Sequence, residues 1–442
     1  MGKMWQGKYE LRINQWGVGN GGFHSQSIHF QPLDRNPVSE AGVGTYLRVI
    51  YDCGSGRSKN PRSCLYRAVA DMVDEMPPGT NVDLLVISHF DMDHVNGLKL
   101  LSEELKREGI RVDQIWTPLL SRIESLYAVM AFAGQDDNDI SEYVHLVHNP
   151  IQVLAELFPR AEVRTISPNP EPIPLVPIEQ ARFGDGFDDG HDDEEVTLGV
   201  QPNGPGLTAK VSSVKSRKFE SLWEFQPYVI ESALAGSAAI EHEARALLGK
   251  SLDEATIDDL VRFSRDSTLW GKFHSAVLQH HKAARPESRT SSSRTGANLS
   301  TLIVYSGPVS PYEWCCHRAG WKALSENPYS VPFAPAWLGT GDAGLLAKSD
   351  VEGLRSVLTQ SRLDRVGFSS APHHGSSRDS GSPLWHALPN VKWVTIEADN
   401  SHGGVAHHHP HSSVVAELMG RNINLHYAVV GNDFKWTDRR HR

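Results

Sequence analysis

Four potential metal ligands lie within six consecutive positions of this chain, directly after a short apolar run. The run, residues 82–87, has the length and composition of a buried strand. The ligands that follow it are the side chains of His89, Asp91, Asp93 and His94. Carboxylates gathered this closely need positive charge nearby to offset the cost of confining them. The pattern therefore predicts a loop at a strand end that binds two metal ions.

A polar turn is the alternative interpretation of this segment. A single Asp after a strand usually caps a helix, here one beginning near Val95. A single His is usually a surface group or a satisfied core group. For the full His-x-Asp-x-Asp-His pattern behind an apolar strand, metal binding is the favoured interpretation.

The same pattern resembles the signature of the metallo-β-lactamase superfamily, His-x-His-x-Asp-His. With Asp in the second place and Ser88 in front, it is similar to the soluble nuclease domain of ComEC-type DNA-uptake proteins. Further blocks follow the family's order, at residues 17–21 with 46–54, 298–304, 337–342, 372–376 and 409–411. The resemblance implies an α/β fold, the αββα metallo-β-lactamase sandwich, with the metals at one rim and a largely helical and loop insertion.

Three segments are expected along the chain. The first and last are the two halves of the sandwich, and the middle one holds an acidic loop, a helical insertion and an Arg- and Ser-rich linker. Helix is expected over residues 119–158 and 229–284, with Ser251-x-x-Glu254 as a capping box. The expected segments are residues 1–178, 179–296 and 297–442.

The resemblance also implies roles for the ligands. His89 and Asp91 are expected to bind the first metal, and Asp93 and His94 the second. Asp342, at the end of an apolar strand, is expected to bridge both ions. Asp93 would in addition orient the attacking hydroxide as a catalytic residue.

The second metal's shell is expected to be completed by His373 or His374, with a slight preference for His374. The superfamily usually supplies one more His to the first metal, between the signature and the bridging Asp. No histidine in that interval lies in a recognisable motif. Either water or a carboxylate therefore completes the first metal's shell, or the first metal binds more weakly.

Three further residues are expected to face the substrate. His409 is a candidate catalytic residue that contacts the scissile phosphate or protonates the leaving group. Ser376 and Asn400 are candidate substrate-binding donors. No residue is expected to bind an organic cofactor.

The ligand set is rich in oxygen, since Asp91 stands where the superfamily has a second His. Oxygen ligands shift the preference from zinc towards manganese or magnesium, while imidazoles keep zinc possible. We therefore expect two divalent ions, Mn²⁺ first and Zn²⁺ second.

Composition limits where such a protein acts. The chain has 442 residues and a formal net charge of −10, which argues against a general nucleic-acid coat protein because phosphate contacts need clustered Lys and Arg. No stretch approaches the ~18 apolar residues of a membrane span, and the polar N-terminus lacks a signal-peptide core. The four cysteines form no evident disulfide framework. A cytoplasmic location without membrane contact is expected, and the oligomeric state is open.

The leading functional hypothesis is a metal-dependent phosphodiester hydrolase, a nuclease acting on DNA rather than RNA. One alternative is a small-molecule phosphodiesterase, lactonase or thioesterase on the same fold. Another is a non-catalytic module in which the metals only hold the fold. A cleft lined by basic side chains would favour a polynucleotide, and the candidates are Arg355, Arg362, Arg365, Arg378 and Lys392.

Two polar segments suggest regulation. Residues 185–195 contain many acids and no Lys or Arg, which predicts a solvated loop that could occlude a DNA cleft as a phosphate mimic. Residues 285–296 are either a flexible linker or a site for protease cleavage. With an activating protease as partner, this arrangement would suit a regulated antiviral defence effector.

Overall fold

The computed structural model describes most of the chain, including both halves of the expected sandwich. The expected segment boundaries at 178/179 and 296/297 lie outside the described residues, as do segments 185–195 and 285–296 and the side chain of Asn400. The described residues are 7–32, 45–56, 61–76, 79–131, 137–167, 223–230, 238–284, 300–308, 336–398 and 409–441.

The first sheet is built mainly from the N-terminal half of the chain. Its strand order is β13-β1-β2-β3-β4-β5-β6. The strands β13 to β3 pair antiparallel and β3 to β6 pair parallel. Tyr51 and Val86, the last residues of β3 and β4, lie opposite one another. The bounds are β1 Gly7–Gln15, β2 His24–Pro32, β3 Thr45–Tyr51, β4 Val82–Val86, β5 Val112–Pro118, β6 Glu162–Ile166 and β13 Phe434–His441.

The second sheet is built from the C-terminal half, in the order β12-β11-β10-β9-β8-β7. The strands β9 to β12 are parallel, so their carboxyl ends lie at one edge. The strands β7 and β8 add antiparallel pairs at the other side. The bounds are β7 Trp223–Val229, β8 Leu302–Pro308, β9 Ala336–Gly339, β10 Val366–Ser370, β11 Trp393–Glu397 and β12 Asn424–Ala428.

The two sheets pack face to face through apolar side chains. Alternate residues of a strand point to opposite faces, and in β4 Leu84 and Val86 join the core between the sheets while Leu85 packs on the outer side. Trp337 of β9 and Phe368 of β10 meet this inner core from the second sheet. Because both faces of β4 are buried, its sequence is an almost continuous apolar run.

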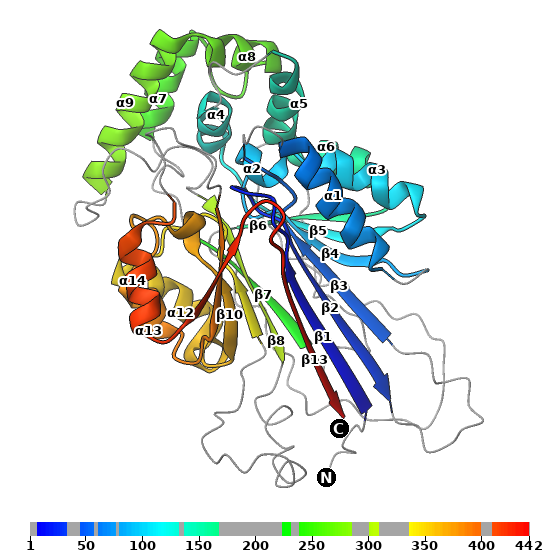
Figure 1. Cartoon of the computed structure of the whole chain (residues 1–442). Coiled ribbons are helices and arrows are strands. Elements are labelled where there is room, and N and C mark those ends of the chain that lie inside the picture. The colour runs from blue at the N-terminus through cyan, green and yellow to red at the C-terminus, as the bar shows by residue number, and fades with distance from the viewer. Residues whose placement is uncertain are drawn as a thin grey trace, which may run out of the picture.

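Helices cover the outer faces of both sheets (Figure 1). Of the helices in the described part of the chain, three pack on the first sheet through one buried apolar cluster, and three pack on the second sheet through another. The chain therefore forms four layers, and the expected α/β class and αββα sandwich are confirmed. The helices on the first sheet are α1 Pro61–Asp74, α3 Leu98–Arg107 and α6 Pro150–Leu157, and those on the second are α12 Lys348–Leu363, α13 Ser382–Ala387 and α14 Ser412–Gly420.

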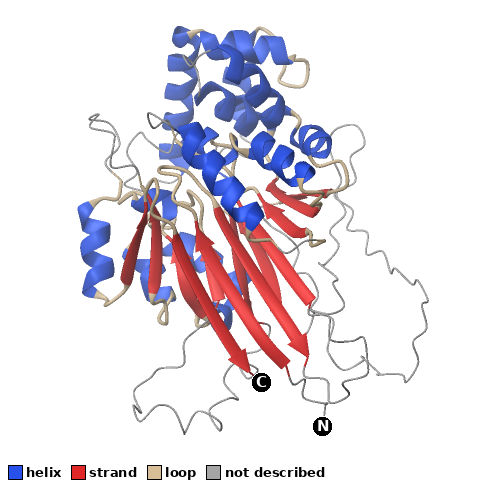
Figure 2. Ribbon diagram, turned by 45° about the vertical axis from the view of Figure 1, so that its right-hand side comes forward, coloured by secondary structure: helices blue, strands red, loops and turns tan. Residues whose placement is uncertain are grey.

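A group of helices gathers beyond one end of the sheets, as Figure 2 shows. Its apolar side chains continue the outer cluster of the first sheet. Helix was expected from residue 229, but residues 223–229 form the edge strand β7, and the helices begin at Ala238. No described helix is both long and apolar enough to cross a membrane. The helices of this group are α4 Arg122–Ala131, α5 Asp137–His148, α7 Ala238–Leu248, α8 Ile257–Arg265 and α9 Ser267–Ala284.

Candidate metal centre

The expected ligands lie at the carboxyl ends of parallel strands from both sheets. The signature loop and the short helix α2 (Met92–Val95) follow β4, and Asp342 follows β9. His373 and His374 lie in the turn after β10, a single 3-10 turn of residues Pro372–Gly375. Segments separated by more than two hundred residues therefore meet at one rim, as the sandwich predicts.

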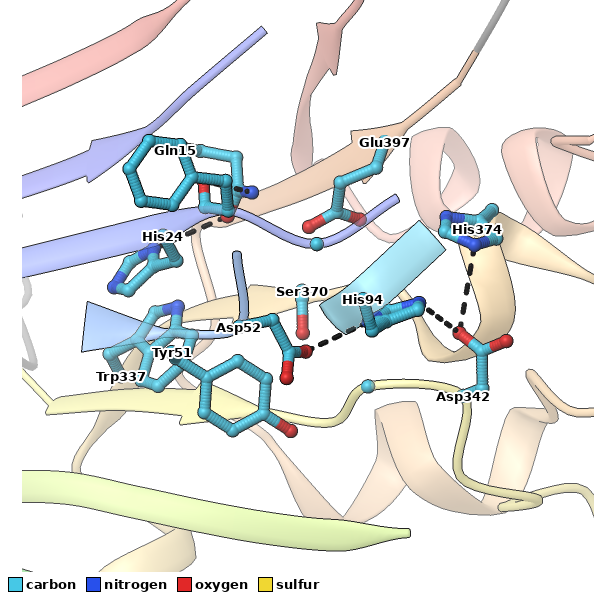
Figure 3. A pocket seen from close by; sticks show the side chains of 13 residues that line it. Gln15, His24, Tyr51, Asp52, His94, Trp337, Asp342, Ser370, His374 and Glu397 are labelled. Carbon is cyan, nitrogen blue, oxygen red and sulfur yellow. Dashed lines mark hydrogen bonds and ion pairs between the residues drawn. The ribbon is translucent and has the colours of Figure 1, made fainter. Parts of the chain in front are cut away.

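The carboxylate of Asp342 lies between the imidazoles of this rim. Its Oδ1 atom is 3.3 Å from His94 Nε2 and 3.7 Å from His374 Nε2. Its Oδ2 atom is 3.7 Å from His89 Nε2 and 3.5 Å from His373 Nε2. Figure 3 shows the interactions of Asp342 with His94 and His374. Each carboxylate oxygen therefore faces its own pair of imidazole nitrogens.

The two signature carboxylates lie on different sides of this arrangement. Asp91 Oδ2 is 3.7 Å from His89 Nε2, and Asp93 Oδ2 is 3.4 Å from His374 Nε2. Ligands that share one ion at bond lengths of about 2 Å lie roughly 3–4 Å apart, which is the spacing seen here.

Among the described residues, two groups have ligand atoms that all lie within 4.8 Å of one another. His94 belongs to both, although it was expected on the second metal alone. The groups are His89, His94 and Asp342, and Asp93, His94 and His374.

Buried nitrogen atoms that lack hydrogen-bond partners show that a cation fits this site. The Nε2 atoms of His89, His94 and His374 are buried and have no hydrogen-bond partner among the described residues. Buried polar atoms are normally satisfied, and leaving them unpaired is costly. Divalent ions bound here would satisfy all three, so the residues present fit a metal centre.

Asp52, the residue after β3, holds the signature loop through hydrogen bonds. Its carboxylate accepts bonds from Ser88 N and Ser88 Oγ, both at 2.6 Å, and lies 2.8 Å from His94 Nδ1. Ser88 Oγ in turn lies 2.8 Å from His89 Nδ1. These contacts fix both rings with Nε2 directed at Asp342, the usual arrangement behind a histidine ligand.

The electrostatics of the rim favour ionised carboxylates beside positive charge. Burial would raise the pKa of Asp93, but His94 and His374 outweigh it and lower that pKa to about 2. Burial also opposes ionisation of Asp342, yet the surrounding histidines bring its pKa well below the usual range. Burial would lower the pKa of His94, but Asp342, Asp52 and Asp93 raise it well above the usual value. The anionic groups thus attract cations, whether protons or metal ions.

The candidate substrate-facing residues have different surroundings. The ring of His409 lies with its centroid 5.2 Å from that of His373. Burial, together with His373 and His374, lowers the pKa of His409 to about 3, so its imidazole is neutral at neutral pH. The hydroxyl of Ser376 is buried and accepts a hydrogen bond from Arg378 N. Substrate contact by His409 and Ser376 stays a prediction.

Three residues near the centre were not expected from the sequence. Asp379 Oδ2 lies 2.7 Å from His373 Nδ1. Glu397, at the end of β11, lines the same pocket as His374, and burial raises its pKa to about 7. Tyr143 of α5 donates a 2.5 Å bond to the carbonyl of Phe90 inside the signature loop. Of the three, only Asp379 is close in sequence to an expected ligand, which was the available signal.

The basic side chains proposed to line a polynucleotide cleft mostly lie elsewhere. Arg362 binds Glu224 through two bonds, and Arg365 and Lys392 directly precede β10 and β11. These positions are at the amino ends of the strands, opposite the rim. Arg355 is exposed on α12. Only Arg378, two residues after Ser376, lies in a loop of the metal centre.

Comparison with known proteins adds little to this geometry. No protein-family model matches the chain, and no curated protein matches it. Among solved structures, the chain is similar to the metallo-beta-lactamase fold protein YhfI from Bacillus subtilis, with 9% sequence identity and a TM-score of 0.34. The match covers 97% of this chain and 100% of that one. A likeness this weak assigns no function, and the fold rests on the sheet topology and the layers described above.

Proposed function

We propose that this protein is a two-metal hydrolase that cleaves phosphodiester bonds, with DNA as the first candidate substrate. The observation that carries the proposal is the Asp342 carboxylate, which presents one oxygen to His94 and His374 and the other to His89 and His373. A carboxylate shared in this way is the arrangement that a dinuclear centre needs.

The chemistry divides between the ions and the chain. Two bound divalent ions would supply an activated water at neutral pH and charge stabilisation for the phosphate oxygens. Asp93, ionised and 27% exposed at its side chain, accepts a proton or a hydrogen bond from the attacking water. The neutral ring of His409 donates a hydrogen bond to a phosphate oxygen. Asp52 and Ser88 keep the signature loop in place throughout.

The donor set supports manganese ahead of zinc. Asp91, Asp93 and Asp342 contribute carboxylate oxygens beside imidazole nitrogens, a mixture that suits Mn²⁺ and still admits Zn²⁺. Magnesium is the third candidate, since it binds through few protein ligands and many waters.

The choice of DNA is supported by the resemblance of the signature and the His-His-Gly-Ser block to ComEC-type nuclease domains. A second candidate, a small-molecule phosphodiesterase, lactonase or thioesterase, is favoured by the position of the basic side chains. Arg362, Arg365 and Lys392 lie away from the rim, so they do not form a phosphate-binding track beside it. Regulation through residues 185–195 and 285–296 by a protease stays a prediction, tested by the basal activity of a variant that lacks 185–195.

One experiment tests the function. Metal-stripped protein is supplied with Mn²⁺, Zn²⁺ or Mg²⁺ in turn and offered linear DNA, circular DNA, RNA, bis(p-nitrophenyl) phosphate, a lactone and a thioester. We expect Mn²⁺-dependent cleavage of DNA and of the model diester. Hydrolysis of the model diester alone would support the small-molecule enzyme, and no hydrolysis with any metal would overturn the proposal.

A further inference from the structure

His373 and His374 are neighbours in sequence but face different oxygens of Asp342. His373 Nε2 approaches Oδ2, the oxygen that His89 also faces, and His374 Nε2 approaches Oδ1. Both residues have positive φ, +47° for His373 and +53° for His374. Such backbone is uncommon for residues other than Gly, Asn and Asp, and it persists where the surroundings impose it. This turn directs two consecutive imidazoles to the two sides of one carboxylate.

The two rings differ in what holds them. His373 Nδ1 lies 2.7 Å from Asp379 Oδ2, and the Asp379 side chain is 4% exposed. A buried carboxylate at this distance accepts a hydrogen bond from Nδ1–H, so Nε2, which is directed at Asp342, is the ring nitrogen available to a metal ion. By contrast, the Nδ1 atom of His374 is buried and has no hydrogen-bond partner among the described residues. His373 is therefore oriented as a ligand, by a contact equivalent to that of Asp52 with His94.

Asp379 is itself fixed by the backbone of its loop. Asp379 N donates to Ser376 O at 3.2 Å, and Leu345 N donates to Asp379 O at 2.8 Å. His373 N donates to Gly341 O at 3.0 Å, which ties the turn to the end of β9 beside Asp342. The backbone contacts therefore fix both the Asp379 carboxylate and the His373 ring beside Asp342.

From this geometry we infer that His373 completes the shell of the first metal and that Asp379 is its positioning residue. The inference rests on the proposed two-metal function. It assigns His374 to the second metal and gives the first metal a histidine that no recognisable motif before Asp342 supplies. No described histidine between the signature and Asp342 belongs to either close ligand group. His373 also lies outside these groups, but its Nε2 atom faces the same Asp342 oxygen as His89. The first metal would then be bound by His89, Asp91, His373 and Asp342 Oδ2. The second metal would be bound by Asp93, His94, His374 and Asp342 Oδ1.

Metal binding, measured apart from catalysis, tests the assignment. The metal-stripped full chain is titrated with Mn²⁺, bound manganese is counted by mass spectrometry, and electron paramagnetic resonance separates coupled Mn pairs from single ions. We expect two Mn²⁺ per wild-type chain with a coupled signal. Asp379→Asn should weaken one site about 10- to 100-fold and leave the other unchanged. His373→Ala should lose that same site.

The double variant shows whether Asp379 acts through His373. Adding Asp379→Asn to His373→Ala should cause no further loss of manganese, because the ring that Asp379 orients is already gone. Matched controls are His386→Ala on α13 and Asp364→Asn after α12, both exposed residues of the same half. Both should bind two Mn²⁺ with wild-type affinity. Should Asp379→Asn fail to fold by circular dichroism, His373→Gln carries the test of the ligand assignment.

The failures of the two proposals are distinguishable. Wild-type protein that binds fewer than two Mn²⁺ would overturn the two-metal function and this assignment with it. Wild-type protein that binds two, with an Asp379→Asn variant of unchanged affinity, would overturn the positioning role alone. Loss of the coupled signal in His374→Ala but not in His373→Ala would overturn the assignment of His373.

Discussion

Asp93 is the signature carboxylate that can act on water as well as bind metal. Its Oδ2 atom lies 3.4 Å from His374 Nε2, and its side chain keeps access to solvent. We expect Asp93→Ala to lower kcat/KM about 10²- to 10⁴-fold, the usual contribution of a positioned acid or base. The thermal midpoint of the metal-free protein should barely move. Asp71→Ala, at a half-exposed position of α1, is the matched control and should keep full activity.

A partly buried carboxylate away from the rim gives the protein a pH-dependent stability. Burial raises the pKa of Asp83 to about 6, although Arg48 N donates to its Oδ2 atom. Between pH 3.8 and about 6, the Asp83 carboxyl therefore keeps its proton in the native state, whereas the unfolded state, in which its pKa is near 3.8, has released it. Stability from this group is present below pH 3.8 and is lost as the pH rises to about 6.

The variant Asp83→Asn removes that ionisation. Relative to wild type, its free energy of unfolding should rise between pH 3.5 and pH 7 by up to about 3 kcal/mol, reduced by the partial exposure of the side chain. Urea unfolding of both proteins at the two pH values measures the difference. Equal pH profiles would show that the pKa of Asp83 is the same in the native and unfolded states.

Candidate ligands could be predicted from the sequence when they come soon after an apolar strand. His89, Asp93 and His94 stand out because they lie close together after β4, and Asp342 stands out because it follows β9. The contact of Asp379 with His373 was not predictable, since it depends on two residues with positive φ that bend the turn back. Nor does a sequence show that Tyr143 reaches Phe90, because that contact needs the packing of α5 against the signature loop.

At the scale of elements, the rim depends on how closely β9 approaches the signature loop. Gly341 follows β9 with φ +47°, and a Cβ atom there would lie 2.8 Å from Ser88 Cβ. Gly341→Ala should therefore combine backbone strain with a clash, costing about 1–3 kcal/mol of stability. It should also displace Asp342 and lower Mn²⁺ affinity at least tenfold.

Gly109→Ala separates the two effects. Gly109 has φ +68°, but nothing lies within 4 Å of a Cβ atom there. Its alanine variant should lose stability and keep wild-type Mn²⁺ affinity, measured by the same titration. If Gly341→Ala binds Mn²⁺ as well as Gly109→Ala does, the close approach of β9 to Ser88 is not what positions Asp342.

Element boundaries were less predictable than element types. The strand β7 was missed because Pro227 and the polar residues around it weaken the strand pattern, yet an edge strand tolerates proline. The capping box expected at Ser251 and Glu254 is a turn, and the box that starts α8 joins Thr256 to Asp259. Both segments fit the same pattern, and only the packing of α8 selects the second.

At the scale of the whole molecule, the metal centre joins two halves of the chain. His89, Asp93 and His94 come from the first sheet, and Asp342, His373 and His374 come from the second. The C-terminal strand β13 also lies in the first sheet, where it pairs with β1. Ions bound at the rim therefore add a link across the sandwich that the apolar core alone does not supply.

Removal of the metals should weaken this link measurably. An ion present at 100 times its Kd stabilises the folded state by about 2.7 kcal/mol, so chelation should lower Tm by several degrees. Hydrogen exchange should rise at the carboxyl ends of β4 and β9 together, since both lose the same ions, and stay unchanged in the core strand β2. In the Asp342→Asn variant, the chelator should change neither Tm nor hydrogen exchange. A chelator that leaves Tm and exchange unchanged in wild type would show that the rim carries no structural metal, and that the two sheets are held by their apolar core and β13 alone.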